Sequence, residues 1–136
     1  MANQAKLTIG RIARLAAVGI DTIRFYERRG LLPKPTRTPA GYRLYTTDTV
    51  DRLNFIRKAK SLGFSLEEIS TLLNLQDNGG PKAEVKAITQ RKLDSINDKI
   101  DDLQKMRDVL NDLNSKCSGE GDICGCPIIE VLSKPE

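Results

Sequence analysis

Histidine and tryptophan are absent from this 136-residue sequence. The absence of histidine removes the usual general base of enzymes and the usual nitrogen ligand of zinc sites. No Ser/His/Asp set can be assembled either, and the sequence contains no glycine-rich phosphate-binding loop. The carboxylates fall on the polar faces of predicted helices. We therefore predict that the protein is not an enzyme.

Long apolar runs are absent as well. No early segment resembles a signal peptide, and no segment is long and apolar enough to span a bilayer. This pattern predicts a cytoplasmic protein without a membrane partner. The only three cysteines lie between residues 117 and 126. Because the cytoplasm keeps thiols reduced, a structural disulfide framework is the weakest explanation for them.

Aromatic residues make up only 4% of the chain, whereas hydrophobic residues as a whole make up 39%. This balance favours a modest core of Leu and Ile, and it favours helices over a β-sandwich. The fold class that we predict is therefore mainly α. The net charge of +4 fits an anionic partner such as DNA without requiring one.

The N-terminal part, residues 1–75, has the pattern of a winged helix-turn-helix domain. Apolar residues recur at helical spacing in two short stretches before Pro33, with a break at Gly19. The segment PKPTRTPAGYRLYT contains three prolines and alternates near its end, which predicts a hairpin wing. Two more helices follow, and the second begins with the capping box Ser65–Glu68. This order of elements favours a DNA-binding domain over a simple helical hairpin.

A long helix with one apolar stripe is predicted for residues 83–116, after a turn-rich linker at residues 76–82. A helix of ~30 residues spans ~45 Å, which is too long to bury its stripe on so small an N-terminal domain. A symmetric homodimer explains the stripe better than a helix that folds back on its own domain. The stripe has the spacing of a coiled-coil seam and consists of Leu93, Ile96, Ile100, Leu103 and Leu110.

Five strings, in this order, resemble the MerR family of bacterial transcription regulators: TIRFYERRGLL, RTPAGYRLY, LGFSLEEI, LQKMRDVL and a cysteine loop ending in CPIIE. The resemblance extends over nearly the whole chain. The tail is similar to those of the metal-sensing members, and the chain as a whole is most similar to CueR-type copper sensors. It implies a winged-helix homodimer with an antiparallel coiled coil, bound to double-stranded promoter DNA where RNA polymerase also binds. Metal binding would then bend and untwist the DNA and activate transcription.

The resemblance also implies which residues contact DNA, on a recognition helix from Ile20 to Arg29 and in the wing. Arginine binds phosphate or guanine edges with two parallel hydrogen bonds, and tyrosine offers a hydroxyl on a stiff side chain. The predicted DNA-binding residues are Thr22, Arg24, Tyr26, Arg37, Gly41, Tyr42 and Arg43. Phe25 is predicted to be a core residue instead, an alternative that also applies to Tyr42 and Tyr45.

The cysteine-rich segment, residues 117–136, is the predicted metal site. Thiolates without imidazole favour Cu(I), Ag(I), Au(I), Hg(II), Cd(II) or Pb(II), and Zn(II) is less natural. The resemblance implies that Cys117 and Cys126 correspond to the paired thiolates of the family, which would bind a monovalent ion linearly. Cys124 is a third candidate ligand.

Two features of the sequence point to different ions. Divalent sensors of the family resemble one another in having a further cysteine near the start of the long helix. In this chain that position falls at about Lys82, and the absence of the cysteine favours a monovalent ion. The eight residues between Cys117 and Cys126 are instead similar to the loop of mercury and zinc sensors. We expect Cu(I), Ag(I) or Au(I), with a divalent Cd, Pb, Hg or Zn sensor as the alternative. A thiol redox or iron–sulfur sensor is the alternative of another class, although iron–sulfur clusters usually need four thiolates.

Overall fold

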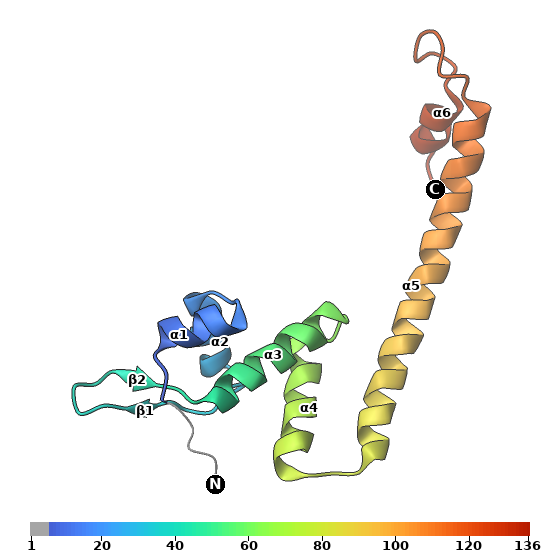
Figure 1. Cartoon of the computed structure of the whole chain (residues 1–136). Helices are drawn as coiled ribbons and strands as arrows, with labels where there is room; N and C mark the ends of the chain where they lie inside the picture. Colours follow the sequence, from blue (N-terminus) through green and yellow to red (C-terminus); the bar gives the residue numbers. More distant parts are fainter. Residues whose placement is uncertain (1–5) are drawn as a thin grey trace. The chain divides into compact units, whose positions relative to one another are not determined.

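The computed structural model of the protein describes residues 6–136, which form helices α1–α6 and strands β1 and β2 (Figure 1). The chain divides into two compact units, one ending at Ile88 and the other beginning at Thr89. The predicted class is confirmed: the fold is mainly helical, with a winged helix-turn-helix domain and a long helix. Within residues 6–136, none of the helices combines the length and apolarity needed to cross a bilayer.

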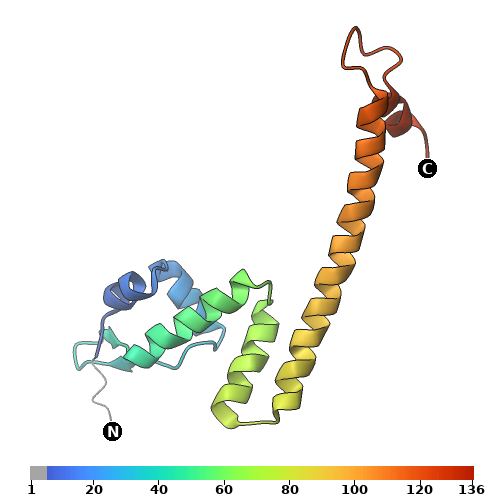
Figure 2. The same cartoon turned by 45° about the vertical axis from the view of Figure 1, so that its right-hand side comes forward.

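Helices α1 (Ile9–Ala16) and α2 (Ile20–Arg28) form the helix-turn-helix (Figure 2). The hydroxyl of Thr8 caps α1 by accepting a hydrogen bond from the backbone N–H of Arg11 at 3.3 Å. Ala17, in the left-handed conformation, ends α1. The apolar faces of both helices, including Ile12 and Ile23, are buried in the core of the first unit.

The wing is a short antiparallel hairpin of β1 (Thr36–Arg37) and β2 (Arg43–Leu44), in which Arg37 lies opposite Arg43. Its turn is closed by hydrogen bonds of 2.8 Å from Thr38 N–H to the carbonyl of Tyr42 and from Gly41 N–H to the carbonyl of Thr38. Gly41 has a φ of 87°, a conformation in which a residue with a side chain would be strained. The glycine of the RTPAGYRLY string is therefore required by the turn of the wing.

Helices α3 (Thr47–Ser61) and α4 (Leu66–Asn78) complete the core of the first unit, and α3 packs against α1. The predicted capping box is present at the start of α4. Ser65 N–H donates to the Glu68 carboxylate at 2.9 Å, and Glu68 N–H donates to the Ser65 hydroxyl at 3.1 Å. The buried residues of this core are mostly Ile and Leu, as the composition predicts.

The predicted linker, residues 76–82, is longer than the one in the structure. Helix α4 continues to Asn78 and α5 begins at Lys82, so only residues 79–81 lie outside the helices. The reason is a tertiary contact: the guanidinium of Arg52, on α3, donates two hydrogen bonds to the Asp77 carboxylate, at 2.5 and 3.1 Å. This ion pair stabilises the last turn of α4, and Gly79 then ends the helix.

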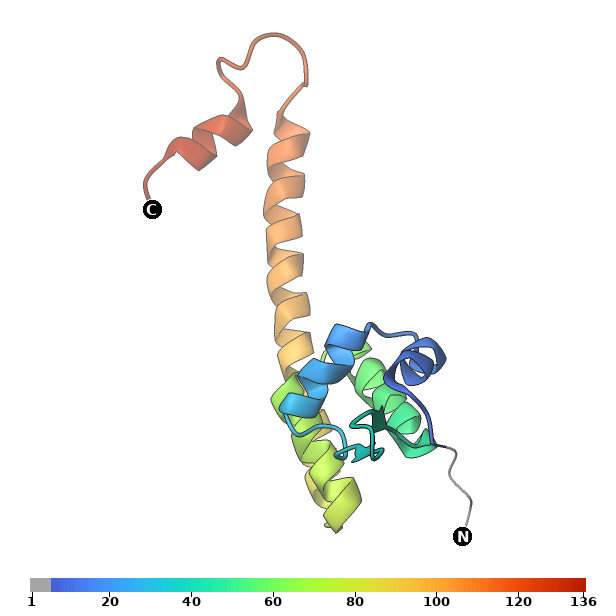
Figure 3. The ribbon, with the colours of Figure 1, turned by 90° about the vertical axis from the view of Figure 1, so that its left-hand side faces the viewer.

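The second unit contains most of α5 (Lys82–Lys116), the cysteine loop and α6 (Pro127–Ser133). Figure 3 shows the loop arching over the end of α5 before the chain enters α6. The extent of α5 agrees with the predicted helix. Helix α6 was not predicted, although Pro127 at its first position is a typical helix start.

Candidate nucleic-acid interface and metal centre

A groove of about 710 Å³ lies between α2 and the wing. Its lining residues that bear a charge are five cations and one carboxylate: Arg24, Arg28, Lys34, Arg37, Arg43 and Glu27. Most hydrogen bonds between proteins and DNA go to phosphate and sugar, and cationic side chains provide the electrostatic part of the affinity. The groove therefore has the chemistry of a surface that binds the DNA backbone.

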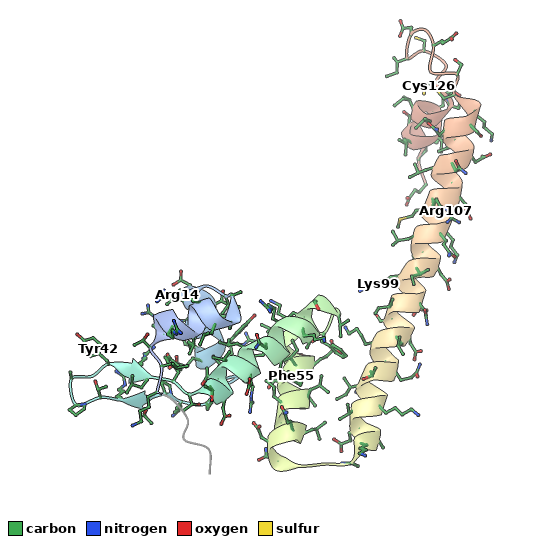
Figure 4. All side chains as sticks on the ribbon, in the orientation of Figure 1. Arg14, Tyr42, Phe55, Lys99, Arg107 and Cys126 are labelled. Atoms are coloured by element: carbon green, nitrogen blue, oxygen red, sulfur yellow. The ribbon has the colours of Figure 1, made fainter. Side chains whose placement is uncertain are left out.

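The structure brings five of the seven predicted DNA-binding residues to this groove: Arg24, Arg37, Gly41, Tyr42 and Arg43. Tyr42 is 73% exposed and projects from the wing in Figure 4. The guanidinium of Arg37 donates a hydrogen bond to the carbonyl of Gly41, within the wing, at 3.4 Å. Thr22 is half-buried and is not part of the lining.

Two aromatic predictions need correction. Tyr26 was predicted to contact DNA, but it is only 6% exposed and belongs to the core, because it follows Ile23 by three residues on the packed face of α2. Phe25 was predicted to be a core residue, but it is 38% exposed and lies beside the Arg29 guanidinium, 5.7 Å from the ring centroid. Tyr45, which directly follows the wing, is buried.

Two lining residues of the groove, Lys34 and Glu27, were not predicted. Lys34 lies between Pro33 and Pro35. Because these prolines restrict the backbone beside the wing, a lysine fixed there could have been recognised as a candidate. No signal in the sequence marks Glu27, an acidic residue followed directly by two arginines.

Glu27 connects the recognition helix to the wing. The Tyr45 hydroxyl donates a hydrogen bond to Glu27 Oε2 at 2.8 Å, and Arg43 Nη1 lies 3.7 Å from the same oxygen. Burial, and then the neighbouring Glu27 carboxylate, raise the pKa of Tyr45. The phenol is therefore protonated at neutral pH and acts as the donor in this contact.

The candidate metal centre is a pair of thiols at the base of the cysteine loop, where Cys126 is labelled in Figure 4. Cys117 directly follows α5, and Cys126 is the N-cap residue of α6. Their sulfur atoms lie 3.9 Å apart, and all three cysteines are free. Since residues 118–125 separate them in the sequence, it is the return of the chain into α6 that brings Cys126 to the end of α5.

The third thiol is placed differently. Cys124 is exposed, whereas Cys117 and Cys126 are half-buried. Gly125, between Cys124 and Cys126, has a φ of 79°, so the chain turns sharply between the two cysteines. Among residues 6–136, no group of three or more Cys, Asp or Glu side chains forms a metal cluster. The geometry thus groups Cys117 with Cys126 and leaves Cys124 outside.

The surroundings of the Cys126 thiol lower its pKa. Hydrogen bonding from the backbone of Ile129 and Ile128, in the first turn of α6, lowers its pKa, and the Cys117 thiol adds to this effect against the opposing influence of burial. The thiolate is the form of cysteine that binds metals. The residues present therefore fit a soft metal ion, which Cys117 and Cys126 would bind as paired sulfur ligands.

The predicted dimerisation stripe is uncovered in the single chain. Leu93, Ile100, Leu103 and Leu110 are exposed, and Ile96 is half-buried. Met106 and Val109 extend the exposed apolar surface along α5. A groove of about 740 Å³ adjoins this surface and is lined by Leu103, Leu110 and Ile128, among others. An exposed apolar surface of this kind is typical of an interface.

Comparisons with known proteins show similarity to a family of transcriptional regulators. The family pattern described as MerR HTH family regulatory protein matches residues 7–76, and the pattern described as MerR, DNA binding matches residues 50–113. The chain is 45% identical over 130 residues to the mercuric resistance operon regulatory protein of Bacillus cereus, a match that covers 95% of this chain and 98% of that protein. It is 40% identical over 128 residues to the transcriptional regulator CueR of Escherichia coli, covering 93% and 94%.

Among solved structures, the transcription regulator PbrR691 from Ralstonia metallidurans in complex with lead(II) is similar, with a TM-score of 0.84 and 33% identity. That match covers 93% of this chain and 99% of the other. The identities do not single out the CueR type, because the mercuric regulator is more similar over the whole chain. These relatives are transcriptional regulators and not enzymes, as predicted for this chain. The chain belongs to the MerR family of transcriptional regulators.

Proposed function

We propose that this protein is a metal-responsive transcriptional activator that binds promoter DNA as a homodimer and responds to Cu(I), Ag(I) or Au(I). The observation that carries the proposal is the 3.9 Å separation of the Cys117 and Cys126 sulfur atoms, with Cys124 outside the pair. Two thiolates without imidazole suit soft monovalent ions. Binding of the ion would order the cysteine loop. The conformation of the bound promoter would change as a result, and RNA polymerase would then use this promoter.

DNA binding is assigned to the groove between α2 and the wing. Its cations, including Arg24 and Arg43, would neutralise phosphates, and the exposed Tyr42 would contact the duplex from the wing. A dimer, formed through the exposed stripe of α5, would present two such grooves to a promoter with two half-sites. A cytoplasmic location stays a prediction from the sequence.

Substitution of Arg24 or Arg43 with alanine is expected to weaken binding to promoter DNA and to reduce its salt dependence. The slope of log K against log salt should fall by about 0.9 for each phosphate that the protein no longer neutralises, or about 1.8 for a dimer. Fluorescence anisotropy at several KCl concentrations measures both quantities. Arg91→Ala, on exposed α5, is the control with the same change of charge. Wild-type slopes in both groove variants would show that the groove does not bind DNA.

A divalent ion, foremost Hg(II), is the second candidate inducer, with Pb(II), Cd(II) and Zn(II) behind it. Two observations favour it: the 45% identity to a mercuric resistance regulator and the eight-residue spacing between Cys117 and Cys126. The fold similarity to a lead(II)-bound regulator adds support. The monovalent ions stay first because only two thiols are paired, and the chain has no cysteine near Lys82 that could supply a third.

A metal competition experiment separates these candidates. The reduced full-length protein is titrated with Cu(I), Ag(I), Hg(II), Pb(II), Cd(II) or Zn(II), and bound metal per dimer and transcription from the bound promoter are measured. We expect two monovalent ions per dimer and activation by Cu(I) or Ag(I). Activation by Hg(II), Pb(II), Cd(II) or Zn(II) alone would establish the second candidate. Activation by peroxide without metal would show a redox sensor instead.

A further inference from the structure

Glu27 is an unexpected residue for a DNA-binding groove. Five cations line the groove, and among the described lining residues Glu27 is the single carboxylate. Taken alone, a negative charge at that position repels phosphate and opposes the binding of DNA. Its presence therefore calls for another role.

The Glu27 carboxylate accepts a hydrogen bond from a buried residue, Tyr45. Tyr45 is buried, and its backbone pairs with Leu7 through hydrogen bonds of 2.6 and 2.7 Å. Its hydroxyl donates to Glu27 Oε2 at 2.8 Å, and the Glu27 side chain is only 15% exposed. The carboxylate thus has little freedom to move.

The same oxygen forms an ion pair with Arg43, a predicted DNA-binding residue of the wing. Arg43 Nη1 lies 3.7 Å from Glu27 Oε2, while the Arg43 side chain keeps 38% of its surface exposed. At this distance the contact is an ion pair and not a hydrogen bond, so it leaves N–H donors of the guanidinium for a phosphate or a base edge. An arginine that is already oriented loses less conformational freedom when it binds.

From this geometry we propose that Glu27 is a positioning and selectivity residue: it orients Arg43 for the correct DNA site and repels phosphates of other DNA. The inference rests on the proposed DNA-binding function of the groove. Orientation of Arg43 favours a duplex that matches the groove, and the negative charge penalises any duplex that does not. Together the two effects increase the ratio of specific to non-specific affinity.

The test compares two probes: a duplex enriched from a random library by the wild-type full-length protein, and a shuffled duplex of the same length. Glu27→Gln is expected to bind the enriched duplex more weakly and the shuffled duplex more tightly, so that the affinity ratio falls roughly fivefold or more, as for other coupled contacts. Glu27→Asp keeps the charge with a shorter reach. It should therefore bind the shuffled duplex as weakly as the wild type does.

A double-mutant cycle with Arg43→Ala shows whether Glu27 acts through Arg43. In the Arg43→Ala background, Glu27→Gln should no longer weaken binding to the enriched duplex. Equal losses in both backgrounds, an unchanged affinity ratio in Glu27→Gln, or tight binding of shuffled DNA by Glu27→Asp would each overturn the role of Glu27. If circular dichroism shows that Glu27→Gln is unfolded, Tyr45→Phe takes its place in the cycle, because it removes the hydrogen bond and keeps the buried ring.

Failure of the broader proposal would look different. If Arg24→Ala and Arg43→Ala both bound the enriched duplex as the wild type does, the proposed DNA interface would be wrong, and this inference with it. If Arg43→Ala bound DNA more weakly but the two substitutions were additive, the interface would stand and only the role of Glu27 would be wrong.

Discussion

Replacement of Cys117 or Cys126 by serine is expected to abolish metal-dependent activation and to leave DNA binding without metal unchanged. Serine offers a hard hydroxyl in place of a soft thiolate, so only one sulfur of the pair would remain. Loss of a residue that merely supports a ligand typically costs 10–100-fold in metal affinity, so loss of a ligand should cost more than about 100-fold. Equilibrium dialysis and in vitro transcription measure the two effects.

DNA binding should survive because the two sites belong to different units of the chain. The groove residues precede Ile88, and the cysteines follow Thr89. Neither cysteine belongs to the core cluster of the first unit, so the serine variants should keep the fold of the winged domain. A serine variant that still responds to metal would show that the pair is not the metal site.

Cys124→Ser is the matched control, because it makes the same chemical change at a thiol that lies outside the pair. Since Cys124 is exposed and the paired sulfurs lie 3.9 Å apart without it, this variant should still respond to Cu(I) or Ag(I). Loss of most of the response would indicate a site with three thiolates and a divalent ion.

Ile100→Lys is expected to convert the dimer into a monomer. Ile100 lies in the middle of the stripe and is exposed in the single chain, so the substitution should not disturb the helix itself. Each buried, unpaired polar group costs about 2 kcal/mol or more, and a symmetric dimer would contain two. The dissociation constant of the dimer should therefore rise by a factor on the order of 1,000, which sedimentation velocity measures over a concentration series.

Asp98→Asn is the control for the added charge. It changes the net charge by the same one unit, and it lies two residues before Ile100, on the other side of α5. This variant should stay dimeric. A wild-type protein that sediments as a monomer, or an Ile100→Lys variant that stays dimeric, would contradict the assignment of the stripe.

Local signals in the sequence predicted most of the fold. The capping box at Ser65, the cap of α1 at Thr8 and the turn at Gly41 depend on groups within four residues of one another, so the sequence pattern contains all the partners. The extent of α5 follows in the same way from an uninterrupted run of helix-compatible residues. These elements needed no knowledge of the rest of the molecule.

By itself, the sequence therefore determined the helices α1–α5, the wing, the apolar stripe and the residue types of both sites. Only the tertiary structure decided which side chains meet. Glu27 contacts Tyr45 across 18 residues, and Arg52 pairs with Asp77 across 25. It also corrected the choice between Phe25 and Tyr26, although the three-residue spacing of Tyr26 from Ile23 was a signal in the sequence that Tyr26 is the buried one. The pairing of Cys117 with Cys126 depended on α6, because only the return of the chain brings the two sulfur atoms together.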